Sequence, residues 1–363
     1  MERKLGIITF HDTNNYGSWL QTYALYSWLK NYKIAVEVIN YQCEELINRE
    51  KITIEKIVQF IRKNDVSKYD ILLKRLIKQA WFRRYTQKYM HLSHKYTHDN
   101  ICSSNNKYDA FMIGSDLVWD TKITGSDFTY MLDFVEKGKF KCSYAASLGD
   151  VKAIEKNRDT YRKLLDRFQY ITVRELDARE ALEGLLEKKV YMVSDPTLLL
   201  PTKKWVEFVS KENKYGKYVL VYFLDDGKKL MRLAKNYAHK YGYRVIFIAD
   251  DYVDKSIQCV NPPNISEFLS LIYYAEKVFT ASYHGMLFSL YFNKQIVYSN
   301  RQPESRMKSI GRYFLIEKHE IHNEYFDIEE KINYDEVNEK IMVLRRYSEN
   351  HLKRMINMWR KNK

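Results

Sequence analysis

Short runs of consecutive apolar residues alternate along the chain with longer stretches in which apolar positions recur every three or four residues. The first pattern predicts strands that are buried on both faces, and the second predicts amphipathic helices. Residues 5–10 form the first apolar run, residues 19–30 have the helical pattern with Ser18 as a candidate cap, and residues 35–41 form the second run. A strand, a helix and a strand in this order make a βαβ motif, which predicts a parallel sheet.

The same alternation continues to the end of the chain, interrupted by a charged, irregular stretch at residues 200–216. We therefore expect an α/β protein with two Rossmann-type parallel-sheet domains, residues 1–200 and 215–315, that face each other across a cleft. Residues 335–363 predict a long helix that crosses back to the N-terminal domain. Further strands are predicted at residues 108–113, 141–146, 170–173, 191–194, 218–224, 244–248, 276–280 and 294–298, and further helices at residues 157–168, 228–241, 265–274 and 286–291.

Residues 48–100 differ in composition and pattern from the rest of the first domain. Lysines and arginines alternate there with Ile, Leu, Phe and Trp, which predicts an insertion of two or three basic amphipathic helices. Such a surface is usually a solvated helical face, and it also suits contact with anionic lipid headgroups.

The net charge of +14 points to an anionic partner, and by itself it does not choose among a phosphorylated substrate, a membrane surface and nucleic acid. No recognised nucleic-acid motif accompanies the charge, so we expect no nucleic-acid partner. Four cysteines without CxxC pairs or zinc spacing predict reduced thiols and no metal site. Because the start of the chain has no signal-peptide pattern, we expect a cytoplasmic protein.

Polar residues follow several of the predicted strands of the first domain. Asn15, Tyr16 and Gly17 open onto a helix N-terminus, where backbone amides bind anions, although an ordinary turn explains the loop equally well. Asp116 follows the strand at 108–113 and is either a helix N-cap or a general base. Arg174 follows the strand at 170–173 and either pairs with Glu175 or another neighbour, or binds a carboxylate or phosphate.

The second domain has its own strand-to-helix turn, at Ser282, His284 and Gly285. In parallel sheets, ligands bind at the carboxyl ends of strands. Histidine exchanges protons near neutral pH, and glycine permits close approach of a ligand or of another backbone segment. The alternative is a capping serine and a histidine packed in the core. Arg306 and Lys308 lie in a basic segment that follows the last strand.

These motifs, in this order, resemble the polysaccharide pyruvyl transferase family over most of residues 5–315. Some members of the family have an arginine where this chain has Ser282, so Arg306 or Lys308 is expected to substitute for it. The matching segments are residues 6–11 (GIITFH), 15–17 (NYG), 20–25 (LQTYAL), 113–119 (IGSDLVW), 143–149 (SYAASLG), 172–175 (TVRE), 193–199 (VSDPTLL) and 280–289 (TASYHGMLFS).

The resemblance implies a GT-B-like fold and transfer of pyruvate from phosphoenolpyruvate, a co-substrate, onto two hydroxyls of a sugar in capsule or exopolysaccharide biosynthesis. It implies no cofactor and no metal, an acceptor side in the first domain and a donor side in the second. The acceptor is then a sugar or lipid-linked oligosaccharide, and the protein is expected at the inner face of the cytoplasmic membrane. On this interpretation His284 and Asp116 are the acid and base, in either assignment, and the substrate-binding residues are Arg174, Asn15, Tyr16, Gly17, Ser147, Ser282, Gly285 and Arg306.

Two other functions remain open at this point. One is a GT-B glycosyltransferase that uses a nucleotide sugar, which would share the fold and a hydroxyl acceptor. The other is a non-catalytic protein of a polysaccharide assembly complex. The sequence does not specify the acceptor sugar, the ketal stereochemistry or the oligomeric state.

Overall fold

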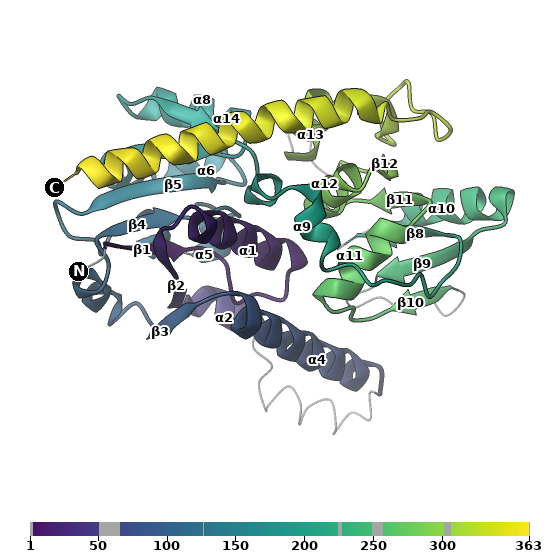
Figure 1. Ribbon diagram of the computed structural model, residues 1–363, viewed down its shortest axis with the longest axis horizontal. Coiled ribbons are helices and arrows are strands. Elements are labelled where there is room, and N and C mark those ends of the chain that lie inside the picture. The colour runs from purple at the N-terminus through teal and green to yellow at the C-terminus, as the bar shows by residue number, and fades with distance from the viewer. Residues whose placement is uncertain are drawn as a thin grey trace. The chain divides into compact units, whose positions relative to one another are not determined.

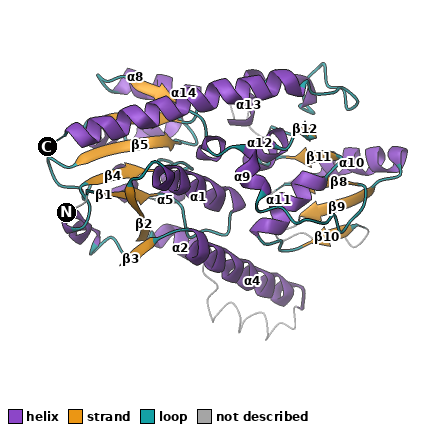
Figure 2. Ribbon diagram, viewed as in Figure 1, coloured by secondary structure: helices purple, strands orange, loops and turns teal. Residues whose placement is uncertain are grey.

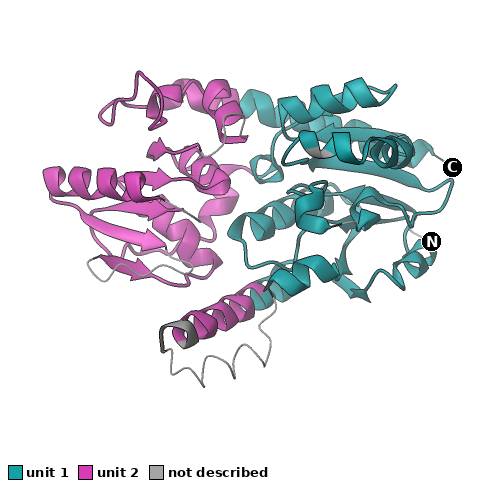
Figure 3. Ribbon diagram, turned by 180° about the vertical axis from the view of Figure 1, so that it is seen from behind, with its two compact units in different colours: residues 1–51, 83–200, 342–363 teal, residues 52–82, 201–341 magenta. Residues whose placement is uncertain are grey.

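The structure, a computed structural model of the chain, describes residues 3–50, 66–125, 127–223, 227–248, 257–300 and 306–362. The chain divides into two compact units, coloured separately in Figure 3. Each unit has its own parallel sheet and its own hydrophobic core. Unit 1 consists of Met1–Lys51, Arg83–Leu200 and Met342–Lys363, and unit 2 consists of Ile52–Phe82 and Pro201–Ile341.

Among its described residues, unit 1 has a seven-stranded sheet in the order β3-β2-β1-β4-β5-β6-β7, and every pair of neighbouring strands is parallel. Strand β1 lies between β2 and β4, with Leu5 opposite both Val36 and Ala110. The strands are β1 (Lys4–Ile8), β2 (Ala35–Tyr41), β3 (Leu92–Tyr96), β4 (Ala110–Ile113), β5 (Phe140–Ala146), β6 (Tyr170–Val173) and β7 (Val190–Met192).

Helices surround the strands of unit 1 (Figures 1 and 2). Every residue of β4, β5 and β6 is buried, as expected for central parallel strands that are covered on both faces. The core between sheet and helices includes Ile8, Trp119 and Leu182. The helices are α1 (Tyr16–Asn31), α2 (Glu44–Glu50), α5 (Thr121–Thr124), α6 (Lys152–Lys156), α7 (Arg158–Leu165) and α8 (Leu176–Leu185).

Unit 2 has a second parallel sheet, five-stranded among the described residues, in the order β10-β9-β8-β11-β12. Thr280 of β11 lies between Tyr222 of β8 and Tyr298 of β12. The elements are β8 (Tyr218–Tyr222), β9 (Arg244–Ile248), β10 (Gln258–Val260), β11 (Lys277–Thr280), β12 (Gln295–Tyr298), α9 (Thr202–Val206), α10 (Lys228–Tyr241), α11 (Ile265–Tyr274), α12 (Tyr283–Tyr291), α13 (Arg306–Tyr313) and the 3-10 helix η4 (Glu317–His319).

Two long helices contain boundaries between the units. Helix α4 (Val66–Tyr89) occupies part of the predicted basic insertion, and residues 51–65 of that insertion lie outside the described residues. Helix α14 (Tyr334–Lys361) is the predicted C-terminal helix. Its second half belongs to unit 1, where the Ser194 amide donates to Ser348 Oγ at 2.9 Å and Arg345 Nε donates to the Leu198 carbonyl at 2.6 Å.

The structure differs from the sequence-based expectation at β3 and at the start of α1. Residues 92–96 were expected to be helical and form the edge strand β3 instead, whose sequence LSHKY has no strong apolar run. Helix α1 is capped by Asn15 rather than Ser18, because the Asn15 side chain accepts from the Gly17 amide. Helix α11 is capped by Asn264, which forms a capping box with Glu267.

Candidate functional site

The carboxyl ends of β1, β4, β5 and β6 lie at one edge of the sheet of unit 1, since these strands are consecutive neighbours. Thr9, Ser115, Ser147 and Arg174 follow them in the chain. Thr9 Oγ1 donates to the Ser115 carbonyl at 2.7 Å, and Arg174 Nη1 donates to Ser115 Oγ at 3.3 Å. The predicted polar strand ends of the first domain therefore meet, at the edge where parallel sheets bind ligands.

Asp116 follows this edge in a strained backbone conformation. Its φ is 85°, a region that residues other than glycine rarely adopt. Its Oδ1 accepts from the Leu117 amide at 2.9 Å, and its Oδ2 accepts from the Ser18 hydroxyl. The following helix α5 is capped by Asp120 and not by Asp116. Because strained residues concentrate at active sites, this conformation favours the functional interpretation of Asp116.

The guanidinium of Arg174 lies in a buried ion cluster. Nε donates to Glu175 Oε1 and Nη1 donates to Asp195 Oδ2, each at 2.9 Å. The side chain of Arg174 is 1% exposed. Of the two alternatives for this residue, the structure shows the ion pair, and the binding of a donor anion by Arg174 stays a prediction.

Ser147 is tied to the same cluster through its hydroxyl, which donates to Glu175 Oε1 at 2.9 Å. A register shift between β5 and β6 precedes it, and Ala145 within this shift has a φ of 56°. Irregular strands of this kind re-aim side chains next to active sites. The backbone amide of Ser147 donates to the carbonyl of Asp116 at 3.1 Å, which joins the cluster to the strained residue.

The predicted anion loop at the start of α1 is largely part of the helix itself. Tyr16 and Gly17 form its first turn and are buried, whereas Asn15 is exposed. The Gly17 amide donates to Asn15 Oδ1 at 2.8 Å, so the cap already uses one of the amides considered for an anion. Ser18, one residue further, reaches Asp116.

In unit 2, the predicted turn joins β11 to α12. Ser282 is the N-cap, and its hydroxyl accepts from the Gly285 amide at 3.3 Å. A Cβ on Gly285 would lie 2.6 Å from Thr280 Oγ1, so packing inside unit 2 already requires glycine there. His284 is 7% exposed, and its ring packs edge-on against Tyr283 with centroids 5.2 Å apart.

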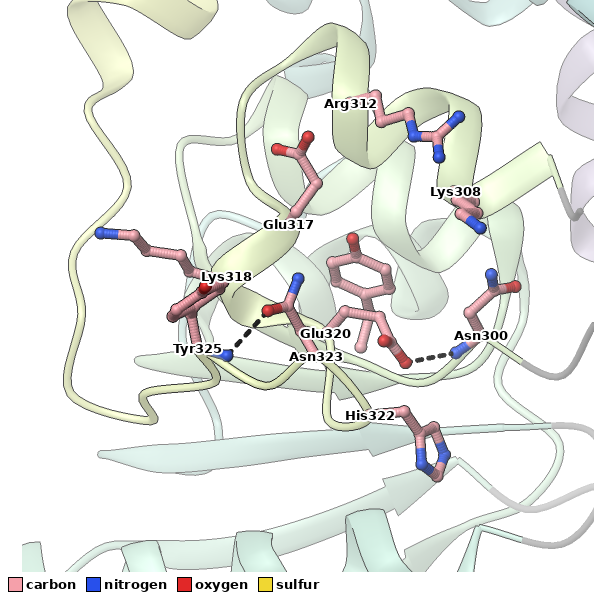
Figure 4. Close-up of a pocket in the computed structure, with 10 residues that line it drawn as sticks. Asn300, Lys308, Arg312, Glu317, Lys318, Glu320, His322, Asn323 and Tyr325 are labelled. Atoms are coloured by element: carbon pink, nitrogen blue, oxygen red, sulfur yellow. Dashed lines mark hydrogen bonds between the residues drawn. The ribbon is translucent and has the colours of Figure 1, made fainter. Parts of the chain in front are cut away.

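Arg306 on α13 lies over the ring of Tyr283, with its guanidinium carbon 5.2 Å from the ring centroid. Arg306 is thus linked to His284 through one aromatic ring. Further along α13, Lys308 and Arg312 line a pocket of about 640 Å³ within unit 2 (Figure 4). The pocket lies beyond the carboxyl end of β12, next to the β11 end that carries Ser282.

Sequence reasoning did not identify several residues of these sites. Ser18 was interpreted as a helix cap, Glu175 was considered only as a partner of Arg174, and Asp195 was noted only within a motif. The pocket residues Glu317 and Glu320 were not singled out at all. The motif letters TVRE and SDPT carried a signal for the ion cluster, since they place charged residues directly after two predicted strands.

Asp116 and His284 belong to different units, so their joint action stays a prediction. Within the described ranges, no three His, Cys, Asp or Glu side chains come close enough to hold a metal ion. None of the described helices has both the length and the apolar character needed to cross a membrane.

Several solved structures share the fold of this chain at low sequence identity. The UDP-GlcNAc 2-epimerase from Methanocaldococcus jannaschii, in complex with UDP-GlcNAc and UDP, is 12% identical with a TM-score of 0.51, covering 95% of this chain and 93% of that one. The UDP-GlcNAc 2-epimerase from Neisseria meningitidis, bound to UDP-GlcNAc, is 12% identical with a TM-score of 0.50, covering 97% and 94%. An alpha-glucosyltransferase in complex with UDP and DNA is 8% identical with a TM-score of 0.50, covering 100% and 94%. The fold is therefore GT-B-like, as predicted.

No curated protein matches the chain. The family model for polysaccharide pyruvyl transferases matches residues 15–303, which include the Asp116 edge of unit 1 and the His284 turn of unit 2. The chain belongs to the polysaccharide pyruvyl transferase family.

Proposed function

We propose that the protein transfers pyruvate from phosphoenolpyruvate onto two hydroxyls of a sugar, as a cyclic ketal, in the biosynthesis of a surface polysaccharide. Membership of the family supports the transferase class. The observation that carries the catalytic part is Asp116, a strained and nearly buried carboxylate that accepts from Ser18 at the edge of a parallel sheet.

The reaction needs three proton transfers, one onto the donor and one from each sugar hydroxyl. The methylene carbon of phosphoenolpyruvate gains a proton while its central carbon is attacked by a sugar hydroxyl, which loses one. Phosphate then leaves, and the second hydroxyl attacks the same carbon and loses its proton to close the ketal. We assign the first donation to His284 and the deprotonation of the hydroxyl to Asp116, because histidine and carboxylate are the usual acid and base near neutral pH.

The donor also needs cations for its carboxylate and phosphate. Arg174 already donates to two carboxylates and is 1% exposed, which favours a positioning role for it. Arg306, which is half-buried on α13 beside Tyr283, is the better placed candidate on the side of His284. We propose that Arg306 binds the donor carboxylate in place of the arginine that other members of the family have at the position of Ser282.

The test is phosphate release from phosphoenolpyruvate with a panel of sugar acceptors. His284→Ala should reduce transfer by roughly 10²–10⁴-fold, the range for loss of a general acid. His239→Ala is the matched control, because His239 is exposed on α10 of the same unit and does not line the pocket. Wild-type rates in His284→Ala would refute the assigned role. If no acceptor supports release by the wild type, a non-catalytic assembly protein becomes the better explanation.

The rival function is glycosyl transfer from a nucleotide sugar. Structures of similar fold were solved with UDP or UDP-GlcNAc. The two reactions use different donors, so donor binding distinguishes them. Ligands that bind the native state raise the melting temperature. We expect stabilisation by phosphoenolpyruvate and none by UDP or GDP, and the reverse result would favour the glycosyltransferase.

We further propose that α4 rests on an anionic membrane surface. Leu73, Leu76 and Ile77 lie on one face of the helix, and each is between 40% and 47% exposed. The helix sequence contains seven Lys or Arg residues and one Asp. Exposed apolar residues on a basic helix are typical of helices that lie in a lipid interface.

Sedimentation with lipid vesicles tests this surface. The protein should bind vesicles that contain phosphatidylglycerol and bind pure phosphatidylcholine vesicles weakly. Leu76→Asp should weaken binding, whereas Val343→Asp should not, because Val343 is an equally accessible apolar residue on α14, at 57% exposed. Equal binding to both vesicle types, or equal loss in both variants, would contradict the proposal.

A further inference from the structure

The pocket of unit 2 is formed by three neighbouring parts of the chain (Figure 4). Tyr298 and Asn300 come from the end of β12, Lys308 and Arg312 from α13, and the remaining residues from η4 and the segment after it. Its volume of about 640 Å³ is in the range of small-molecule sites. It is larger than the three-carbon donor of the proposed reaction requires.

One side of the pocket is cationic. Lys308 and Arg312 project from successive turns of α13 and lie together on this side in Figure 4. Among the described residues, neither makes an ion pair. Two like charges four residues apart on a helix repel each other, so an anion bound between them removes an unfavourable interaction as well as forming charge-assisted hydrogen bonds.

The centre of the pocket carries hydrogen-bonding groups of the kind that bind hydroxyls. Glu320 Oε1 accepts from the Asn300 amide at 3.3 Å, and the Glu317 carboxylate lies across from it. The side-chain oxygen of Asn323 accepts from the Tyr325 backbone amide at 2.8 Å. The side-chain NH₂ group of Asn323 can then donate to a ligand. Carboxylates repel an anionic group at this place but accept hydrogen bonds from hydroxyls.

Two tyrosines complete the surface. The Tyr298 ring is buried at the floor, and its hydroxyl lies against Gly311, where a Cβ would come within 2.3 Å. Burial, and after it the nearby Glu320 and Glu317, raises the pKa of Tyr298, so its hydroxyl remains a donor at neutral pH. Tyr325, 68% exposed, presents an apolar ring on the side opposite Lys308 and Arg312, next to Lys318. A flat ring face with a polar tip suits the face of a sugar ring.

We propose that this pocket binds a sugar that carries a negatively charged substituent, with the anion on Lys308 and Arg312 and the sugar hydroxyls on Glu317, Glu320 and Asn323. Lys308 and Arg312 lie on α13, whereas the third lining cation, Lys318, lies on η4 and pairs with Glu330 at 3.7 Å. The α13 cations orient the ligand, since the reverse orientation would bring its anion against Glu317 and Glu320. The inference rests on the proposed function only in assigning this sugar to the acceptor, which would then bind in unit 2 and not, as the resemblance implied, in the first domain. The binding itself requires no donor.

Isothermal titration without phosphoenolpyruvate tests the binding. The probes are glucose 1-phosphate, glucuronic acid, glucose and inorganic phosphate. We expect a charged sugar to bind at least about tenfold more tightly than both glucose and inorganic phosphate, because one lacks the anion and the other lacks the hydroxyls. The two charged probes distinguish a phosphate substituent from a carboxylate.

Variants locate the two halves of the site. The double variant Arg312→Ala/Lys308→Gln should weaken binding of the charged sugar at least about tenfold and leave binding of glucose unchanged. Glu320→Gln should weaken binding of the charged sugar and leave binding of inorganic phosphate unchanged. Arg232→Ala is the matched control, because Arg232 is an exposed arginine on α10 of the same unit and does not line the pocket.

Three outcomes would overturn the inference. They are equal binding of glucose and its phosphate, equal losses in the Arg312 and Arg232 variants, and competition by phosphoenolpyruvate for the same site. Failure of pyruvyl transfer with binding intact would refute the proposed function and leave the pocket assignment standing. Transfer that the pocket variants do not affect would separate the pocket from the acceptor site.

Discussion

At the scale of single residues, Asp116 combines backbone strain with a side chain that is held in place. A positive φ at a residue other than glycine costs about 1–3 kcal/mol and persists only where the surroundings enforce it. The Ser18 hydroxyl and the Leu117 amide hold the carboxylate, and the Ser147 amide holds the carbonyl. The sequence identified Asp116 by its place after a strand, but φ and the partner Ser18, which is distant in the chain, depend on the packed sheet.

Asn15 acts as a helix cap, whereas Ser18 acts in the candidate site. Asn15→Ala should lower the free energy of unfolding by about 1 kcal/mol, because the Gly17 amide loses its acceptor. Ser18→Ala leaves that cap intact and should reduce transfer about tenfold or more, since the carboxylate of Asp116 loses one of its two donors. Urea unfolding and initial rates measure the two effects. A Ser18 variant with a normal rate would remove Ser18 from the site.

Arg174, whose buried guanidinium pairs with two carboxylates, should prove important for stability. Arg174→Met leaves the carboxylates of Glu175 and Asp195 buried without their cation, which typically costs 3–5 kcal/mol. Arg179→Ala, at an arginine whose side chain is 37% exposed on α8, should change stability by less than about 0.5 kcal/mol. Comparable unfolding midpoints for the two variants would show that the cluster contributes little.

At the scale of elements, the prediction succeeded where strands have apolar runs and failed at the edge strands β3 and β10. Apolar runs identified β6 and β9 with the bounds that the structure has, because all of β6 and the last three residues of β9 are buried. Edge strand β3 has the sequence LSHKY, and only its pairing with β2 determines its conformation. A local pattern does not contain such a pairing.

Gly285 shows how one element constrains another. A methyl group in Gly285→Ala would lie 2.6 Å from Thr280 Oγ1 and 3.0 Å from the Tyr222 ring, so α12 or the strand ends must shift, at about 1–3 kcal/mol. Gly184→Ala on α8 is the matched control, because nothing lies within 4 Å of its added methyl group and alanine favours a helix. Thermal unfolding should show a loss for the first variant and no loss for the second. Equal effects would mean that the α12 turn adapts freely.

At the scale of the whole molecule, each unit contains a buried histidine that acid should charge. Burial, and after it the charge of Lys277, lowers the pKa of His319 in unit 2 from 6.5 to about 4. Burial also lowers the pKa of His351 in unit 1, where the Tyr170 hydroxyl and His351 Nδ1 are 2.7 Å apart. The unfolded chain therefore takes up protons at a higher pH than the folded chain at both positions.

Stability that depends on a neutral histidine is complete above the unfolded pKa and is lost as pH falls toward the folded pKa. For His319 the gap between 6.5 and about 4 corresponds to about 3 kcal/mol. We therefore expect the free energy of unfolding to fall from pH 7 to pH 4. In His319→Gln and His351→Gln the fall should be shallower, because glutamine does not titrate. His322→Gln, at an exposed histidine, should keep the steep wild-type profile. Equal slopes in all four proteins would assign the acid sensitivity to carboxylates instead. Each of the two histidines would then contribute a stabilisation that does not change with pH.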